Sequence, residues 1–115
     1  MGGDDSNVTT STVLDVSDLL PQEEQSVRLL AAAADPVRWT VLNRLGRGQA
    51  CVCELQEHIP IPANLLSYHL KVLRDAGLVT TRRRGRWIDY TLAEDARVRL
   101  EAALPASLNA AAEPT

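Results

Sequence analysis

Apolar residues recur every three or four positions over much of the chain, which is the spacing of amphipathic helices. The segment from Pro21 has a proline and acidic residues in its first turn and apolar residues at helical spacing after it, so it predicts a first helix. Asp35 and Pro36 have the properties of an N-cap and a first helical residue. They predict a second helix, which ends at the glycines Gly46 and Gly48.

Two further helices follow, separated by prolines. A third helix is predicted to begin near Ala50 and to contain CVCELQEHI, and Pro60 and Pro62 stop it because proline removes a backbone donor. The segment ANLLSYHLKVLRDAG predicts a fourth helix that ends at Gly77. Its leucines gather on one face, and its polar side chains project from the opposite face.

The pattern changes after the fourth helix. Residues 78–82 and 87–92 flank Arg83-Arg84-Gly85-Arg86, and the second segment alternates apolar and polar positions, which predicts a two-stranded hairpin with a basic tip. An Ala-rich amphipathic segment predicts a last helix from about residue 93 through 104. The expected fold is mainly helical with a small β-hairpin (α+β), in the order ααααββα of a winged helix-turn-helix.

Composition supports one domain. The 115 residues are 45% hydrophobic, with 3% aromatic residues and no Phe, which favours a core of aliphatic helix faces. We expect a flexible acidic arm over residues 1–15, one domain over 16–104 and a frayed tail over 105–115. No apolar run approaches the roughly 18 residues of a membrane span, and the acidic start is unlike a secretory signal, so we expect a cytoplasmic protein without a membrane partner.

Positive charge is concentrated in one region, although the net charge is −3. Residues 1–25 contain acidic residues and no Lys or Arg, whereas residues 63–92 contain one Lys and five Arg against two Asp. A basic stretch within an acidic chain is typical of a nucleic-acid interface. We predict that it contacts double-stranded DNA through the polar face of the fourth helix and through the hairpin, with these residues: Asn64, Ser67, Tyr68, His69 at the edge of the packed face, Lys71, Arg74, Arg82, Arg83, Arg84 and Arg86.

The segments ADPVRWTVLNRL, ACVCEL, LLSYHLKVLRDAGLV and RRGRWIDYTL resemble the ArsR/SmtB family of metal- and metalloid-responsive bacterial repressors. The resemblance, closest to the arsenic-sensing type, implies a winged-helix homodimer paired through its first and last helices, which binds operator DNA and releases it when an inducer binds. It also implies that SYHLKVL belongs to the recognition helix and that residues 83–86 form the wing. The chain departs from the family pattern at Pro62, where a Ser cap is common.

Cys51 and Cys53 lie one residue apart at the start of the third helix and resemble the arsenic and cadmium motif of this family. We expect both thiols to be reduced, because disulfides are rare inside cells. Thiolates suit As(III) and other thiophilic ions. Residues i and i+2 lie roughly 200° apart on a helix, so the pair can hold one ion only if the first turn loosens or Cys51 lies just outside it. Without the resemblance, two small hydrophobic core side chains would be the slightly better interpretation.

A third sulfur is missing. Arsenic sensors of this type commonly carry a third Cys where this chain has Gln56, and residues 1–50 contain no Cys. Two thiolates suit arsenite with an external third ligand, or an organoarsenical whose carbon substituent fills one position. His58, with Glu54 or Glu57, is a weaker candidate for Zn(II), and residues 93–115 contain no His for the family's site on the last helix.

Three alternatives to this repressor remain at the level of the sequence. In the first, the fold is the same but Cys51 and Cys53 sense oxidants or electrophiles, so a reductant would restore DNA binding after induction. A winged-helix interaction module differs in binding DNA weakly and without sequence preference. An enzyme is disfavoured, because the sequence has no Gly-rich phosphate loop and no paired carboxylates in a strand-helix frame.

Overall fold

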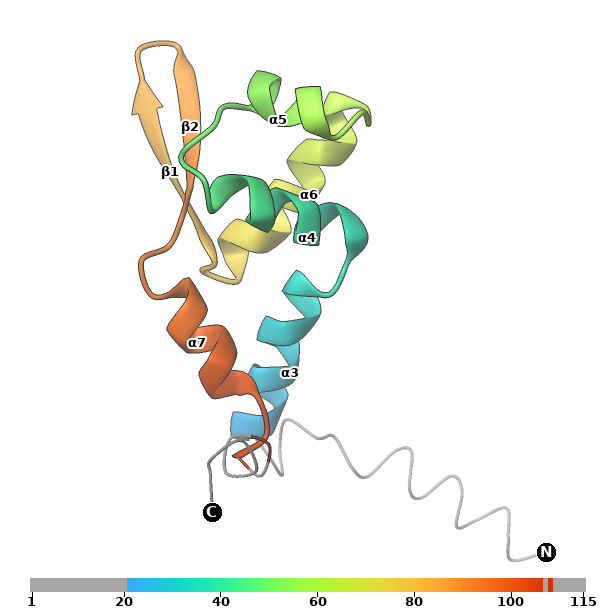
Figure 1. Cartoon of the computed structure of the whole chain (residues 1–115), viewed down its shortest axis with the longest axis vertical. Helices are drawn as coiled ribbons and strands as arrows, with labels where there is room; N and C mark the ends of the chain where they lie inside the picture. The colour runs from blue at the N-terminus through green and yellow to red at the C-terminus, as the bar shows by residue number, and fades with distance from the viewer. Residues whose placement is uncertain (1–20, 107, 109–115) are drawn as a thin grey trace, which may run out of the picture.

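The computed structural model describes residues 21–106 and residue 108 (Figure 1). The elements within this part of the chain are α3 (Pro21–Ala33), α4 (Pro36–Leu45), α5 (Val52–His58), α6 (Ala63–Asp75), β1 (Val79–Arg84), β2 (Trp87–Leu92) and α7 (Ala96–Ala103). The predicted order ααααββα is confirmed. The predicted arm, residues 1–15, and most of the predicted tail, residues 105–115, lie outside the described residues.

The helix boundaries follow the local signals in the sequence. Asp35 caps α4, since its carboxylate accepts hydrogen bonds from the backbone N–H groups of Val37 at 2.9 Å and Arg38 at 3.0 Å. Gly77 follows α6 with a φ of 78°, a left-handed conformation that glycine adopts without strain. Pro62 precedes α6 and supplies no side-chain cap, yet the helix begins directly after it, at Ala63.

The hairpin is antiparallel, with Val79 opposite Leu92 and Arg84 opposite Trp87. The turn therefore consists of only two residues, Gly85 and Arg86, with Gly85 at a φ of 63°. The sequence-based expectation of a four-residue tip was too long, because Arg83 and Arg84 extend β1. The last helix likewise begins at Ala96, three residues later than predicted.

A third segment pairs with the hairpin. Ala50, just before α5, exchanges two backbone hydrogen bonds with Tyr90 of β2, of 3.0 and 2.8 Å. Ala50 is fully buried by this pairing. The chain therefore enters α5 along the edge of the hairpin, and the residue after Ala50, Cys51, lies next to β2.

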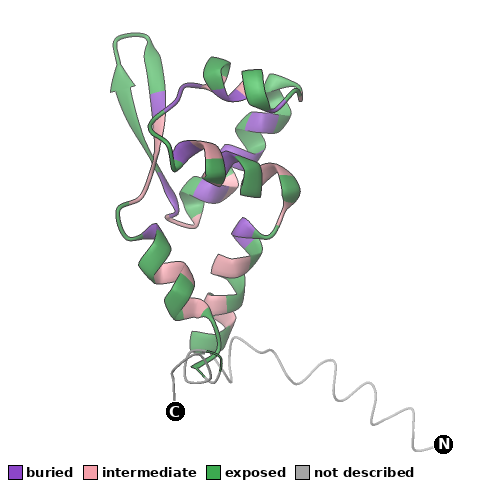
Figure 2. Cartoon of the chain, in the orientation of Figure 1, coloured by how far each residue is buried: buried purple, intermediate pink, exposed green. Residues whose placement is uncertain are grey.

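The core is aliphatic and centres on α6. Leu66, Leu70 and Leu73 of this helix are almost fully buried and pack with Leu55 and Leu78. The hairpin extends from the upper part of the molecule, near α5, whereas α3 and α7 lie side by side at the opposite end (Figure 1). Buried residues gather between these ends, and the tip of the hairpin is exposed (Figure 2). Among the described residues, none of the helices has the length and hydropathy required to cross a membrane.

Candidate DNA-binding surface and thiol site

The outer face of α6 is polar and exposed. Asn64, Ser67 and Tyr68 lie on this face, and Tyr68 keeps 57% of its surface accessible. Lys71 is also exposed and donates to Asp75 at 2.7 Å, an exposed pair one helical turn apart that water screens strongly. Arg74 completes this row at the C-terminal end of the helix. Five of the ten predicted DNA-contacting residues are therefore exposed on this one face of α6.

His69 is placed differently from the other predicted DNA contacts. Its surface is only 9% exposed, and its Nδ1 lies 2.9 Å from Nη1 of Arg38 and 3.7 Å from Oδ2 of Asp35. Arg38 also donates from Nε to the carbonyl of Ala32, at the end of α3, at 2.6 Å. The side chain of His69 therefore belongs to a polar junction of α3, α4 and α6, and its burial leaves little surface for the DNA contact that the sequence predicts.

The arginines of the wing, defined as β1, β2 and their turn, divide into two kinds. Arg82, Arg83 and Arg86 are exposed. Arg84 instead forms a two-pronged ion pair with Asp89 across the hairpin, with Nε–Oδ2 at 2.7 Å and Nη2–Oδ1 at 3.0 Å. Hydrogen bonding to Arg84, opposed by desolvation, holds the pKa of Asp89 below its ordinary value. Among the four predicted arginines of the wing, Arg84 is therefore the least available to bind a phosphate, because its charge is already paired with Asp89.

Cys51 is the N-cap residue of α5. Its backbone is extended, with φ −89° and ψ 173°, and its N–H donates to Oε1 of Glu54 at 2.9 Å. This hydrogen bond is the main reason that the pKa of Glu54 lies below its ordinary value, and a hydrogen bond with the Cys51 side chain is the second. Cys51 is buried, whereas Cys53, the second residue of α5, is exposed. Of the two geometries that allow the pair to act together, the structure has the one in which Cys51 lies just outside the helix.

Both cysteines line one recess of about 200 Å³ between the start of α5 and the wing. Its complete lining consists of Cys51, Val52, Cys53, Arg86, Trp87, Ile88 and Tyr90. His58 is exposed at the opposite end of α5. Within residues 21–106, no group of three or more His, Cys, Asp and Glu side chains is arranged to hold a metal ion. The described part of one subunit therefore offers two thiols to a soft ion without a third protein ligand beside them.

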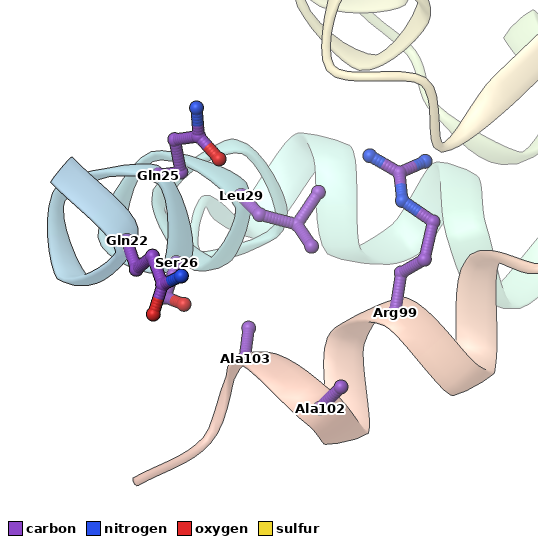
Figure 3. Close-up of a pocket in the computed structure, with 7 residues that line it drawn as sticks. All are labelled: Gln22, Gln25, Ser26, Leu29, Arg99, Ala102 and Ala103. Atoms are coloured by element: carbon purple, nitrogen blue, oxygen red, sulfur yellow. The ribbon is translucent and has the colours of Figure 1, made fainter.

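A second recess of about 330 Å³ lies between α3 and α7 (Figure 3). Leu29 extends from α3 toward α7, and Ala102 and Ala103 line the recess from the other side. Val27 of α3 and Val98 of α7 are 63% and 66% exposed. These two helices thus leave apolar surface uncovered in the single chain.

Several residues of these surfaces escaped prediction. The sequence pattern predicts Trp87, Ile88 and Tyr90 only as positions of an alternating strand, and it gives no role to Arg38. Their roles depend on contacts between segments far apart in the sequence. The one available signal in the sequence was the pair of bulky apolar residues, Trp87 and Ile88, directly after a basic turn.

Comparisons with known proteins agree with this architecture. The family described as "Bacterial regulatory protein, arsR family" matches residues 35–81, from the cap of α4 into β1. The arsenical resistance operon repressor of Bacillus subtilis (strain 168) is 40% identical over 80 residues, which cover 69% of this chain and 73% of that protein. The HTH-type transcriptional repressor SmtB of Mycobacterium tuberculosis is 46% identical over 66 residues, which cover 57% of this chain and 49% of that protein.

A solved structure gives the same result at the level of the fold. The crystal structure of a "Possible transcriptional regulator for arsenical resistance" superposes with a TM-score of 0.64 at 33% sequence identity, covering 75% of this chain and 97% of that one. The match includes the helices and the hairpin that carry both candidate surfaces. The chain therefore belongs to the arsR family of bacterial regulatory proteins, whose members are DNA-binding transcriptional repressors rather than enzymes.

Proposed function

We propose that this protein is a homodimeric repressor that binds double-stranded operator DNA and releases it when a thiophilic metalloid or metal, As(III) or an organoarsenical, bonds Cys51 and Cys53. The observation that carries the proposal is that both cysteines line one recess at the start of α5. The helix that follows them, α5, packs on α6, which exposes the polar face predicted to contact DNA. We assign the binding and sensing unit to residues 16–104.

The conformation of Cys51 supports a shared ligand. Two cysteines at positions i and i+2 of a regular helix point to different sides. Cys51 has extended backbone angles, so its direction is not fixed by helical geometry. A short adjustment of this N-cap residue can bring its sulfur toward Cys53, whose side chain is already exposed. Soft thiolates select soft acceptors such as As(III), Cd(II) and Pb(II).

The same adjustment gives a route from the thiols to the DNA surface. Moving Cys51 strains the hydrogen bond from its backbone N–H to Glu54. It also strains the neighbouring backbone pairing of Ala50 with Tyr90. Leu55, one turn further into α5, is fully buried in the core with Leu66 of α6. A ligand that prefers the displaced start of α5 therefore shifts the population away from the arrangement that binds DNA.

Contact with DNA is assigned to α6 and the wing. A helix fits the major groove of B-DNA, and an adjacent basic hairpin reaches the backbone or the minor groove. We assign base or phosphate contacts to Asn64, Ser67 and Tyr68, and phosphate contacts to Lys71, Arg74, Arg82, Arg83 and Arg86. Arg84 has a secondary role here, because Asp89 already holds its guanidinium.

Pairing of two chains is assigned to α3 and α7. Their exposed valines form the apolar part of the surface that a second copy would cover, and the recess between the helices adds both polar side chains and Leu29, Ala102 and Ala103 (Figure 3). A two-fold dimer buries the same surface on both chains. It also presents two copies of α6 to successive turns of the same face of DNA.

The test is fluorescence anisotropy of a labelled fragment of the DNA upstream of the coding sequence, in a phosphine reductant that keeps thiols reduced. We expect tight, sequence-dependent binding that arsenite reverses, and a weaker response to Zn(II) than to Cd(II). The double variant Cys51→Ser/Cys53→Ser should bind the same DNA and keep it in the presence of arsenite. Release of DNA from this variant by arsenite would overturn the thiol site.

The same assay separates the alternatives. A redox sensor would ignore arsenite under the phosphine and release DNA only after an oxidant is added, with recovery on renewed reduction. An interaction module would bind the upstream fragment and a scrambled fragment equally weakly. Each result contradicts a different part of the proposal, the inducer in the first case and the operator in the second.

A further inference from the structure

We propose that the recess between α5 and the wing is a subsite for the organic substituent of a trivalent arsenical of the type R–As(OH)₂, in which R is an apolar or aromatic group. The inference rests on the proposed function, because the arsenic atom would be bonded by the same two thiols. It goes further by naming the class of inducer and the residues that select it. The juxtaposition that carries it is a pair of cysteines facing bulky apolar residues of the wing.

The walls of the recess differ in chemistry. The α5 side contributes both thiols and Val52, and the wing contributes Trp87, Ile88 and Tyr90 together with Arg86. The pairing of Ala50 with Tyr90 holds these two sides together, so the recess is part of the fold and not a gap between independent segments. An apolar protein cavity of about 150 Å³ accommodates benzene. The recess, with about 200 Å³, has room for a group of that size beside the sulfurs.

Two residues of the wing are exposed in a way that the DNA-binding role does not explain. Trp87 and Ile88 are 46% and 41% exposed, although they directly follow a turn that ends in Arg86. Phosphate contacts require charge or hydrogen-bond donors, which neither aliphatic nor indole ring surface supplies well. An apolar substituent seated in the recess would cover part of this surface and gain the free energy of burying it.

Coordination chemistry gives the same ligand class. Each thiol replaces one hydroxyl group: R–As(OH)₂ and two Cys–SH give R–As(S–Cys)₂ and two waters. Two As–O and two S–H bonds break, two As–S and two O–H bonds form, and arsenic remains trivalent throughout. The carbon substituent already occupies the third position on arsenic, so two protein sulfurs complete the site. Inorganic arsenite, in contrast, keeps one hydroxyl that the described residues provide no third sulfur to replace.

A substituent in this position contacts the wing directly. It would lie between the start of α5 and β2, and its bulk would act on the two elements that the Ala50–Tyr90 pairing joins. We therefore expect the size of R to influence both the affinity for the arsenical and the extent of DNA release.

The first experiment compares inducers on the full chain bound to its DNA, under a phosphine reductant. Arsenite, methylarsonous acid and phenylarsonous acid are titrated, and the concentration for half-release is measured by anisotropy. We expect the phenyl compound to act at a concentration roughly tenfold lower than arsenite, with the methyl compound between them. Equal half-release concentrations for all three would overturn the subsite and leave the thiol switch intact.

Substitutions locate the preference. Trp87→Ala should remove most of the advantage of the phenyl compound over arsenite and leave the response to arsenite within about twofold. The matched control is Trp39→Ala on α4, because Trp39 is 59% exposed and lies outside the lining of the recess. An equal loss of preference in both variants, or in neither, would contradict the assignment to the wing.

A second measurement needs no DNA. The chain contains two tryptophans, so Trp39→Phe leaves Trp87 as the only indole emitter. Phenylarsonous acid should change the intensity or wavelength of Trp87 emission with saturation at one equivalent per chain, whereas arsenite should change it less. The triple variant with Cys51→Ser and Cys53→Ser should give no change with either compound. A Trp87 signal that survives loss of both thiols would show binding unrelated to arsenic coordination and overturn the inference.

The experiments distinguish failure of the proposed inducer from failure of the subsite alone. If the Trp39→Phe chain shows no saturable change and none of the three arsenicals releases DNA, the proposed inducer itself is wrong. If arsenite releases DNA through the two cysteines but the phenyl group brings no advantage, only the subsite is wrong.

Discussion

At the scale of single residues, Asp89 shows how the wing keeps its shape. Its carboxylate is 3% exposed in the middle of a six-residue strand, where a carboxylate is costly without a partner. Arg84 of β1, two positions along the strand from the residue opposite Asp89, supplies two hydrogen bonds. The Arg84 guanidinium neutralises the charge of Asp89 and links β1 to β2 through these two hydrogen bonds. The main role of Arg84 is therefore structural.

We predict that Asp89→Asn lowers the melting temperature more than Asp75→Asn does. Both carboxylates pair with a basic side chain, but the Asp75 side chain is 59% exposed and that of Asp89 only 4%. Water screens the first pair, whereas in the second the buried carboxylate accepts two hydrogen bonds from Arg84, and an amide at position 89 can accept only one of them. Circular dichroism melts of the two variants and the wild type test this order. Equal shifts would mean that the Arg84–Asp89 pair is screened like a surface pair.

The pH dependence of stability follows from the same group. Its folded-state pKa lies below the ordinary 3.8, chiefly because of the hydrogen bonds from Arg84. The contribution of Asp89 to stability is therefore complete above pH 3.8, and it is lost as the pH falls through the lower folded-state pKa. We expect the melting temperature of the wild type to fall below about pH 4. Asp89→Asn should make this fall shallower, and an unchanged slope would contradict the assignment.

The junction of Arg38, His69 and Asp35 gives a residue-scale counterpart in the body of the domain. Arg38 contacts the carbonyl of Ala32 and the ring of His69, so it links the end of α3 with α6. Sequence periodicity placed His69 at the edge of the packed face, which is correct, but could not reveal its partner 31 residues away. Helical periodicity predicts the direction in which a side chain points, but it does not predict which residue of another segment the side chain contacts.

At the scale of elements, α6 is fixed at its C-terminal end by α7. Arg99 donates to the carbonyls of Gly77 at 2.7 Å and Ala76 at 2.9 Å. These carbonyls follow a helix whose last turn lacks further helical donors. A guanidinium at a helix C-terminus also interacts favourably with the helix dipole. The proposed dimerisation helix and the proposed recognition helix are therefore connected by one side chain.

We predict that Arg99→Met lowers the free energy of unfolding by about 1–2 kcal/mol, since two charge-assisted hydrogen bonds are lost. Arg97→Met is the matched control on the same helix, because Arg97 is 87% exposed and pairs only with Glu101 one turn away. The control should change stability by less than about 0.5 kcal/mol. Urea unfolding followed by circular dichroism measures both. A similar small change in the two variants would show that Arg99 does not stabilise the end of α6.

Elements also show what could be predicted and what could not. The cap of α4 at Asp35 and the glycine after α6 were predicted correctly, because each depends on neighbouring residues. The length of the hairpin turn and the pairing of Ala50 with β2 were not, since backbone pairing between distant segments leaves no local pattern. For the same reason, sequence spacing identified the two cysteines but not the recess that they share with the wing.

At the scale of the whole molecule, the two candidate surfaces lie at opposite ends. The wing and the start of α5 lie at one end, and the uncovered faces of α3 and α7 lie at the other (Figure 1). The core of α6 leucines joins them. In the proposed repressor, the first end meets DNA and the inducer, and the second holds two chains in the spacing that DNA requires.

We predict that Val27→Glu converts the proposed dimer to a monomer at micromolar concentration and weakens operator binding at least tenfold. Val27 is 63% exposed on α3 and borders the uncovered surface between α3 and α7. A carboxylate without a partner, buried in an apolar interface, is strongly unfavourable. Sedimentation velocity gives the oligomeric state, and Asn43→Glu, an exposed position on α4, is the charge-matched control. A Val27→Glu dimer as stable as the control would place the interface elsewhere.

The salt dependence of DNA binding tests how charge is distributed over the whole molecule. Although the net charge is −3, binding depends on the local arginines that displace counterions from phosphates. Arg83→Gln removes one free wing cation from each chain, so the slope of log K against log salt should become shallower by about 2 for a dimer. Arg97→Gln removes the same charge from α7 and should leave the slope unchanged. A net-charge mechanism would instead change both slopes equally. Because the two variants share one net charge, any difference between them measures where on the molecule the DNA lies.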